Sequence, residues 1–168
     1  LILLKKIGVI FKSSELRTYV LIVISAVALI TFNIYPLYNN FSSAIRSATF
    51  QTSSIITTTG YATADFNLWP GLSRGVIFLL LFMGGCAGST AGGLKVSRVM
   101  LLGKTVVREL KRLVHPRSVS TVTLEGKKVE ETTVQSTAAY FILYMALIAV
   151  VFFILSFESF GLETNLTA

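Results

Sequence analysis

Long stretches without any charged side chain constrain this chain more than any other feature. Four runs of the 168 residues contain no Asp, Glu, Lys or Arg, namely 18–45, 47–64, 75–94 and 132–157. About 20 helical residues cross a hydrocarbon layer roughly 30 Å thick, so at least three of these runs are long enough to span a membrane. With 53% hydrophobic residues, 14% charged residues and a mean hydropathy of +0.72, the chain is too apolar for an ordinary soluble domain of this size. We therefore expect an all-α, polytopic membrane protein.

The basic side chains cluster at the ends of the apolar runs that we expect to face the cytoplasm. Of the 15 Lys and Arg, all but Arg46 and Arg74 lie before residue 18 or between residues 95 and 128. Because cytoplasmic loops of membrane proteins are enriched in Lys and Arg, this distribution places those two segments in the cytoplasm. Membrane topology thus explains the net charge of +7, and no nucleic acid is expected as a partner. We expect Arg46 to be hydrated near the outer surface or, if buried, to lie beside a carboxylate or carbonyl groups.

Cysteine and histidine each occur once in the chain, as Cys86 and His115. This excludes a disulfide framework and argues against a metal site built from several ligands of this chain. An intramembrane hydrolase using Ser89 and His115 is also disfavoured, because 26 residues separate a serine in the membrane from a histidine at its surface. We therefore expect neither enzyme activity nor a cofactor. The chain starts at Leu1 without a signal-peptide pattern and stops at Ala168, so we expect a fragment of a longer protein.

Residues 42–66 have the pattern of a re-entrant loop that enters the membrane and returns to the same side. Residues 18–36 predict an outward helix that ends at Pro36, and the helix-compatible segment that follows is only about 15 residues, or roughly 22 Å, long. Asp65 and Trp69 then indicate the outer interface again. Irregular backbone at membrane depth is tolerated only where it lines a cavity or packs against protein.

The sequence Thr57-Thr58-Thr59-Gly60-Tyr61, which follows the short helix, is suited to binding a dehydrated cation. Extended Thr and Gly residues present successive carbonyl oxygens that can replace the water shell of K⁺. Gly60 permits the positive φ that turns carbonyl groups inward, and Thr58 can add its hydroxyl oxygen. A β-branched turn at the membrane surface is the alternative for these five residues taken in isolation.

Residues 84–93 are all small, and five of the ten are glycine. Each glycine costs about 1 kcal/mol relative to alanine inside a helix, so a regular helix is not expected here. The pattern predicts an inner helix over residues 74–114 that is broken at 84–93. Close helix packing through small residues four apart is the alternative. A phosphate-binding loop is disfavoured, because no glycine directly precedes Lys95 and no strand leads into the segment.

Beyond this break, residues 95–114 predict an amphipathic helix with Lys and Arg on one face and Val and Leu on the other. One interpretation is a helix that leaves the membrane with its basic face among lipid headgroups, and the other is a docking surface for a cytoplasmic partner. The polar segment 115–131 is expected at the same cytoplasmic surface, with a turn at residues 125–128.

Two motifs resemble one known family. Residues Thr58-Thr59-Gly60-Tyr61 are similar to the filter strand of the Trk/Ktr/HKT potassium transporters, and residues 84–95 closely resemble the inner helix of the third repeat in bacterial members. The resemblance covers essentially the whole chain and implies the third helix, pore-loop, helix repeat followed by the outer helix of the fourth. The segments it implies are a cytoplasmic-side segment at 1–17, an outer transmembrane helix at 18–36, a pore helix and filter loop at 42–66, the broken inner helix at 74–114, a cytoplasmic loop at 115–131, the next outer transmembrane helix at 132–157 and the start of an extracytoplasmic segment at 158–168.

The same resemblance implies potassium uptake across the cytoplasmic (inner) membrane of a bacterium, through a pore that four repeats surround. The implied partners are the lipid bilayer, a regulatory ring of cytoplasmic nucleotide-binding subunits and a second copy of the full-length membrane subunit. Because three further filter strands are absent here, this chain cannot close a four-sided filter alone, and a non-conducting assembly subunit is the alternative. K⁺ would be coordinated at Thr58, Thr59, Gly60 and Tyr61. An intramembrane gate directly below this filter would be formed by Gly84, Gly85, Gly88, Ser89, Thr90, Gly92 and Gly93.

Overall fold

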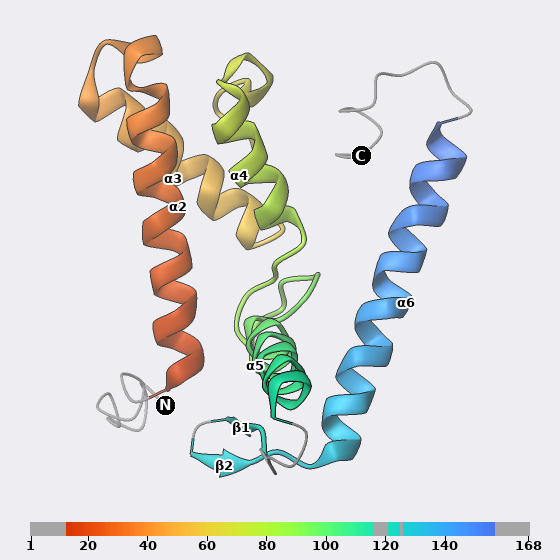
Figure 1. Cartoon of the computed structure of the whole chain (residues 1–168). Coiled ribbons are helices and arrows are strands. Elements are labelled where there is room, and N and C mark those ends of the chain that lie inside the picture. The colour runs from red at the N-terminus through yellow and green to blue at the C-terminus, as the bar shows by residue number, and fades with distance from the viewer. Residues whose placement is uncertain (1–12, 116–120, 125, 157–168) are drawn as a thin grey trace. The chain divides into compact units, whose positions relative to one another are not determined.

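The computed structural model describes residues 13–115, 121–124 and 126–156 of the chain. The chain divides into two compact units, Leu1–Met100 and Leu101–Ala168, and each is described by itself. Helices dominate both units, as Figure 1 shows, so the expected all-helical class is confirmed apart from one pair of two-residue strands.

Helix α2 (Ser14–Tyr38) is the first long apolar helix of the first unit. The Ser13 side chain caps it by accepting a hydrogen bond from the backbone N–H of Leu16 at 3.5 Å. Its 25 residues extend over about 37 Å, which is enough to cross a membrane. The expectation that the helix ends at Pro36 was wrong. A proline so close to the end removes a single backbone hydrogen bond, and the helix continues to Tyr38 before Asn39 terminates it in the left-handed region.

Three helices pack together in this unit. Helix α3 (Phe41–Ile56) lies against α2, and α4 (Gly71–Leu81) contacts both of them after a short 3₁₀ turn, η1 (Phe66–Leu68). The Ser73 hydroxyl donates a hydrogen bond to Asn33 Oδ1 at 2.7 Å, which fixes α4 to α2. Ala44 and Ala48 of α3 are buried in one cluster with apolar residues of α2, and such small side chains let two helices approach closely. One buried apolar cluster consists of Ile30, Ile34, Ala44, Ala48, Trp69 and Ile77, and a second consists of Ala26, Ile56 and Leu80.

The charge-free run at residues 75–94 is not one spanning helix. Helix α4 stops at Leu81, and α5 (Val96–Val114) begins only after a non-helical segment, so the expected break in the inner helix is confirmed. Within the described residues, two helices are long and apolar enough to cross a membrane, α2 and α6 (Glu131–Leu155). Helix α3 has 16 residues and a length of about 24 Å, which is too short to cross a layer of roughly 30 Å.

The second unit joins the later part of α5 to α6 through a small hairpin. Strands β1 (Thr123–Leu124) and β2 (Lys127–Lys128) pair in antiparallel register within the segment that was expected to be a loop. Leu101 of α5, Val122 before the hairpin and Val134 of α6 form a buried cluster. The Lys104 ammonium donates a hydrogen bond to the carbonyl oxygen of Thr123 at 2.6 Å, so both apolar and polar contacts hold the hairpin against α5.

Candidate functional site

The segment 57–61, here called the TTTGY loop, leaves the C-terminal end of α3 with an unusual backbone. Thr58 has φ 57° and Gly60 has φ 75°, whereas Thr59 between them does not lie in the positive region. A β-branched residue at positive φ is uncommon and costs of order 1–3 kcal/mol unless its surroundings hold it there. This alternation differs from that of a regular strand, in which successive carbonyl groups point to opposite sides.

Ser54, in the last turn of α3, holds the TTTGY loop in this conformation. Its side chain is buried, and its hydroxyl donates a hydrogen bond to the carbonyl oxygen of Tyr61 at 2.6 Å. Its own carbonyl oxygen accepts hydrogen bonds from the Thr59 backbone N–H at 3.0 Å and from the Thr59 hydroxyl at 3.1 Å. One buried residue therefore contacts both ends of the segment that carries Gly60.

The carbonyl oxygens of Thr58, Thr59 and Gly60 are free to bind another ligand. Within the described part of the chain, no backbone or side-chain donor bonds to these three oxygens, whereas the oxygen of Tyr61 is taken by Ser54. The C-terminal end of α3, which has no basic residue in its last turn, precedes them directly. Because the helix macrodipole is negative at this end, the local potential favours a cation.

The two ends of residues 84–93, here called the glycine-rich loop, lie close together. We call this closure, formed by residues 82–84 and 92–94, the neck of the loop. The backbone N–H of Gly84 donates to the carbonyl oxygen of Leu94, and the N–H of Leu94 donates to Phe82 at 3.1 Å. A Cβ atom on Gly84 would lie 2.1 Å from the carbonyl oxygen of Gly92. Only glycine at residue 84 allows the two sides of the neck to approach this closely.

Two charged side chains form hydrogen bonds with backbone groups of the glycine-rich loop. Lys95 donates hydrogen bonds from Nζ to the carbonyl oxygens of Ser89 at 2.6 Å and of Ala91 at 2.7 Å. Glu15, in the first turn of α2, accepts a hydrogen bond from the backbone N–H of Ala87 at 2.7 Å. The loop is thus a defined structure although it is not helical.

The glycine-rich loop and the TTTGY loop are in direct contact. The backbone N–H of Gly92 donates a hydrogen bond to the hydroxyl oxygen of Thr58 at 3.1 Å. The structure therefore places side by side the two segments that the resemblance implied to be neighbours. The loop residues Gly88, Ser89 and Thr90 are exposed in this chain, as are Thr58, Thr59, Gly60 and Tyr61. Arg46 is likewise exposed, in agreement with the hydrated alternative.

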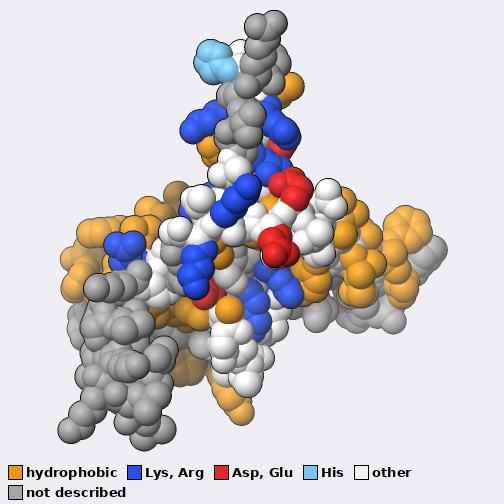
Figure 2. All heavy atoms as spheres, turned by 90° about the horizontal axis from the view of Figure 1, so that it is seen from below, with side chains coloured by type: hydrophobic (Ala, Val, Ile, Leu, Met, Phe, Trp, Pro, Cys, Tyr) orange, Lys and Arg blue, Asp and Glu red, His pale blue; other side chains and the backbone are white. Residues whose placement is uncertain are grey.

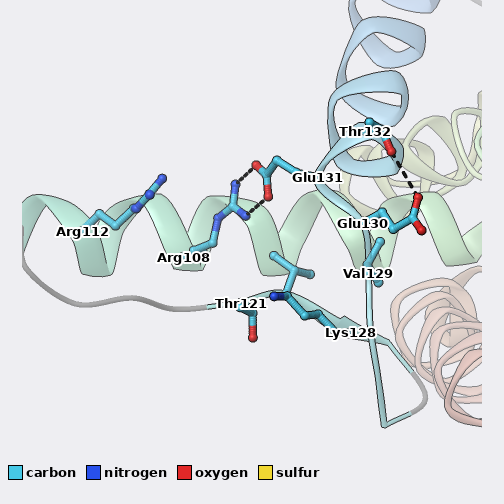
Figure 3. Close-up of a pocket in the computed structure, with 9 residues that line it drawn as sticks. Arg108, Arg112, Thr121, Lys128, Val129, Glu130, Glu131 and Thr132 are labelled. Carbon is cyan, nitrogen blue, oxygen red and sulfur yellow. Dashed lines mark hydrogen bonds and ion pairs between the residues drawn. The ribbon is translucent and has the colours of Figure 1, made fainter.

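The amphipathic helix α5 carries the basic face expected from the sequence, and Figure 2 shows Lys and Arg side chains gathered along it. Arg108 forms a bidentate ion pair with Glu131 at the start of α6, with N–O distances of 2.8 and 2.9 Å (Figure 3). These hydrogen bonds raise the pKa of Arg108 above its ordinary value. Beside the pair lies a cleft of about 610 Å³, which Arg112 and Lys128 also line. Part of the basic face is therefore already neutralised within the chain.

Comparison with known proteins identifies the family. Residues 5–166 match the family described as "TrkH: Cation transport protein". The chain belongs to the TrkH family. This match covers nearly the whole chain and confirms the resemblance that the two motifs indicated.

Individual relatives of the TrkH family agree. The chain is 39% identical over 144 residues to the Trk system potassium uptake protein TrkH of Vibrio parahaemolyticus, a match that covers 84% of this chain and 29% of that protein. It is 36% identical over 163 residues to the Trk system potassium uptake protein TrkG of Escherichia coli, covering 95% of this chain and 33% of the relative. The crystal structure of the potassium transporter TrkH from Vibrio parahaemolyticus superposes with a TM-score of 0.84 at 33% identity, over 93% of this chain and 34% of that one. The chain thus spans about a third of the length of the relatives it matches.

Two residues that contact these TrkH-family loops were missed by the sequence analysis. Ser54 was passed over as part of a helix, although a small hydroxyl in the last turn before a carbonyl-lined loop was a usable signal. Glu15 is the only acidic residue before Asp65, within a segment that is otherwise basic, and this isolation was the corresponding signal. Neither side chain's contact could be located without the fold.

Proposed function

We propose that the full-length protein takes up potassium ions across the cytoplasmic membrane of a bacterium, and that this chain supplies one of the four walls of its pore. Its relatives are named as Trk system potassium uptake proteins, and the match extends over most of this chain. The chain is proposed to act by binding and releasing an ion, without covalent chemistry, as a transporter and not as an enzyme.

The three free carbonyl oxygens of the TTTGY loop are the observation that carries this proposal. Carbonyl oxygens held at fixed positions replace the water shell of K⁺ without a formal charge that would trap it. The Ser54 hydrogen bonds hold the loop in a conformation with positive φ at Thr58 and Gly60, which is unfavourable for Thr58. K⁺ is therefore proposed to bind at Thr58, Thr59 and Gly60. Tyr61 contributes less, because its oxygen already accepts the Ser54 hydroxyl.

The glycine-rich loop is proposed to be the gate of this pore. It touches the TTTGY loop through Gly92 and Thr58, so a change in its position is felt directly at the ion site. Its glycines absorb changes in backbone angles at low cost, and its C-terminal end continues into α5. Movement of α5 would therefore be transmitted to the loop.

The basic face of α5 is proposed to dock a cytoplasmic ring of nucleotide-binding subunits. Arg112 and Lys128 line the cleft beside the Arg108–Glu131 ion pair, so an acidic partner surface would find compensating charge there. The full-length subunit is further proposed to function as a homodimer in the bacterial inner membrane. The two long apolar helices α2 and α6 support insertion into the bilayer.

The test is rubidium uptake into liposomes that contain the purified full-length subunit. The parent protein should take up rubidium and discriminate against sodium, and Gly60→Ser should lose discrimination before it loses flux. A protein that inserts normally but moves no rubidium, with or without its regulatory subunits, would instead be an assembly subunit. Unchanged selectivity in Gly60→Ser would reject the TTTGY loop as the filter.

A second experiment separates a gate from a packing motif. Deleting residues 88–92 should raise rubidium flux and weaken its dependence on the regulatory ring, because the obstruction is removed. A packing motif would lose assembly and flux together. A deletion variant that assembles normally but conducts no faster than the parent would exclude the gate.

A further inference from the structure

We infer that Glu15 is a positioning residue that holds the glycine-rich loop in its closed conformation by bonding to the loop and to the start of α5 at once. One carboxylate oxygen, Oε1, accepts the backbone N–H of Ala87 at 2.7 Å and the backbone N–H of Ser97 at 3.3 Å. Glu15 lies 72 residues from Ala87 and 82 from Ser97, so α2 contributes a contact that neither partner could make locally. This inference rests on the proposed role of the loop as a gate.

The first turn of α5 shows why a carboxylate is needed. The first backbone N–H groups of a helix have no partners inside the helix and normally bond to a capping side chain. The residue before α5 is Lys95, whose ammonium group has no acceptor atom. The N–H of Val96 bonds instead to the carbonyl oxygen of Gly85 at 3.2 Å, and the N–H of Ser97 bonds to Glu15. The Glu15 carboxylate therefore accepts from both the loop and the start of α5, and a loop carbonyl group accepts the other N–H.

Lys95 binds the glycine-rich loop as well, through its carbonyl oxygens, so that Glu15 and Lys95 together form a clamp on the loop. Its ammonium donates to the carbonyl oxygens of Ser89 and Ala91, while Glu15 accepts from the N–H of Ala87. The two opposite charges thus hold alternate residues of the same loop through backbone groups of opposite polarity. Hydrogen bonds that involve a charged group are worth about twice a neutral one, so these contacts favour one conformation of a segment that glycine otherwise leaves loosely ordered.

The isolated position of Glu15 in the sequence supports a dedicated role. It is the only acidic residue before Asp65, and the other charged residues of the first 17 are all Lys or Arg. A displacement of α2 relative to α5 would lengthen one of its two hydrogen bonds and loosen the loop. Glu15 therefore couples the outer helix of the repeat to the gate, in addition to the coupling through α5.

The test uses Cys86, which lies in the loop next to Ala87 and is the single cysteine of this chain. In the full-length subunit, with any cysteine outside this chain replaced, the rate of Cys86 labelling by a neutral maleimide reports how often the loop opens. Glu15→Ala should raise this rate about tenfold, a change of roughly 1.4 kcal/mol, because the two hydrogen bonds are lost. Rubidium flux without the regulatory ring should rise in parallel.

Glu15→Gln is the conservative control, because it removes the charge near Cys86 but keeps an oxygen acceptor at the same reach. Its labelling rate should stay within about threefold of the parent, since a neutral hydrogen bond is weaker but present. Arg17→Ala, an exposed neighbour in the same turn, should not change the rate. Glu15→Asp, which is too short to reach both N–H groups, should resemble Glu15→Ala and serves if the alanine variant does not assemble.

Labelling of Cys86 at the parent rate in Glu15→Ala and Glu15→Asp would overturn the inference. Equal acceleration in Glu15→Gln and Glu15→Ala would also overturn it, because charge alone would then explain the effect. If the parent protein moves no rubidium, the proposed transport function fails, but the labelling rates still decide whether Glu15 closes the loop. Failure of the inference and failure of the proposed function are therefore distinguishable.

Discussion

The hydroxyl oxygen of Thr58 accepts a hydrogen bond from the backbone N–H of Gly92, 34 residues later, at 3.1 Å. Since Thr58 lies in the TTTGY loop and Gly92 in the glycine-rich loop, this hydrogen bond links the proposed ion site directly to the proposed gate. The methyl group of Thr58 is also the nearest side-chain atom that a Cβ on Gly92 would meet, at 3.9 Å. Both polar and apolar parts of one side chain thus face the loop.

Thr58→Val should loosen this contact while leaving the shape of the side chain nearly unchanged. Loss of one hydrogen bond of about 0.5–1.5 kcal/mol predicts a two- to tenfold rise in rubidium flux without the regulatory ring. Thr58→Ser keeps the hydroxyl and should stay closer to the parent than the valine variant does. If valine and serine variants conduct alike, the Thr58–Gly92 hydrogen bond does not restrain the loop.

Gly60→Ala should lower the selectivity for potassium over sodium. No atom lies within 4 Å of a Cβ built on Gly60, so steric overlap is not the reason. Its φ of 75° is the reason, because an alanine in the left-handed region costs roughly 1–2 kcal/mol and favours turning a carbonyl group away from the ion. Competition between rubidium and sodium in the liposome assay measures the effect.

Gly75→Ala is the matched control for Gly60. Gly75 also has open space around its Cβ position, but it lies inside α4 with ordinary helical geometry. Alanine should be neutral there or stabilise the helix by about 1 kcal/mol. Equal loss of selectivity in both variants would show that the assay responds to general damage and not to the carbonyl row.

Ser54→Ala should relax selectivity without abolishing flux. The substitution removes the hydroxyl that donates to Tyr61 at 2.6 Å, but it leaves the backbone hydrogen bonds of Ser54 to Thr59 in place. We expect a two- to tenfold fall in the potassium-to-sodium flux ratio, equivalent to a hydrogen bond of about 0.5–1.5 kcal/mol. Ser53→Ala, one residue earlier and exposed, should leave the ratio unchanged, and a similar fall in both would contradict the role of Ser54.

The elements that the sequence predicted are those determined by composition within one segment. The apolar length of residues 18–36 and 132–157 was sufficient to predict α2 and α6, and the ten small residues at 84–93 were sufficient to predict the break between α4 and α5. Pro36 misled the prediction of a helix end, because the loss of one hydrogen bond matters little in the last turn of a helix stabilised by packing. The β1–β2 hairpin was missed because two-residue strands carry almost no sequence pattern.

Contacts between distant segments could not be predicted in the same way, and only the proximity of the glycine-rich loop to the TTTGY loop was expected, from the family resemblance. The types of residue at the candidate site were evident, since Thr and Gly before an interface and a run of glycines each have a local physical meaning. The hydrogen bonds of Glu15 to Ala87 and Ser97 depend on how α2 packs in the fold, which spacing along the chain does not encode. Roles for the site residues in ion binding and gating therefore stay predictions that flux measurements must decide.

Gly84→Ala should force the glycine-rich loop open, and Gly88→Ala should not. Both substitutions add one methyl group to the same loop. At residue 84 the new Cβ would lie 2.1 Å from the carbonyl oxygen of Gly92 and 3.1 Å from that of Leu94, and both are backbone atoms of the neck that cannot move aside independently. At residue 88 nothing lies within 4 Å.

Overlap of this kind typically costs about 1–3 kcal/mol, so the neck should separate and rubidium flux without the regulatory ring should rise about tenfold in Gly84→Ala. Flux in Gly88→Ala should stay within about twofold of the parent, because the added methyl group meets no atom within 4 Å and Gly88 does not lie in the left-handed region. Size-exclusion chromatography shows whether each variant still assembles. A Gly84→Ala protein that loses assembly and flux together would indicate that residues 84–93 serve helix packing, whereas normal assembly with parental flux would show that the neck does not control the pore.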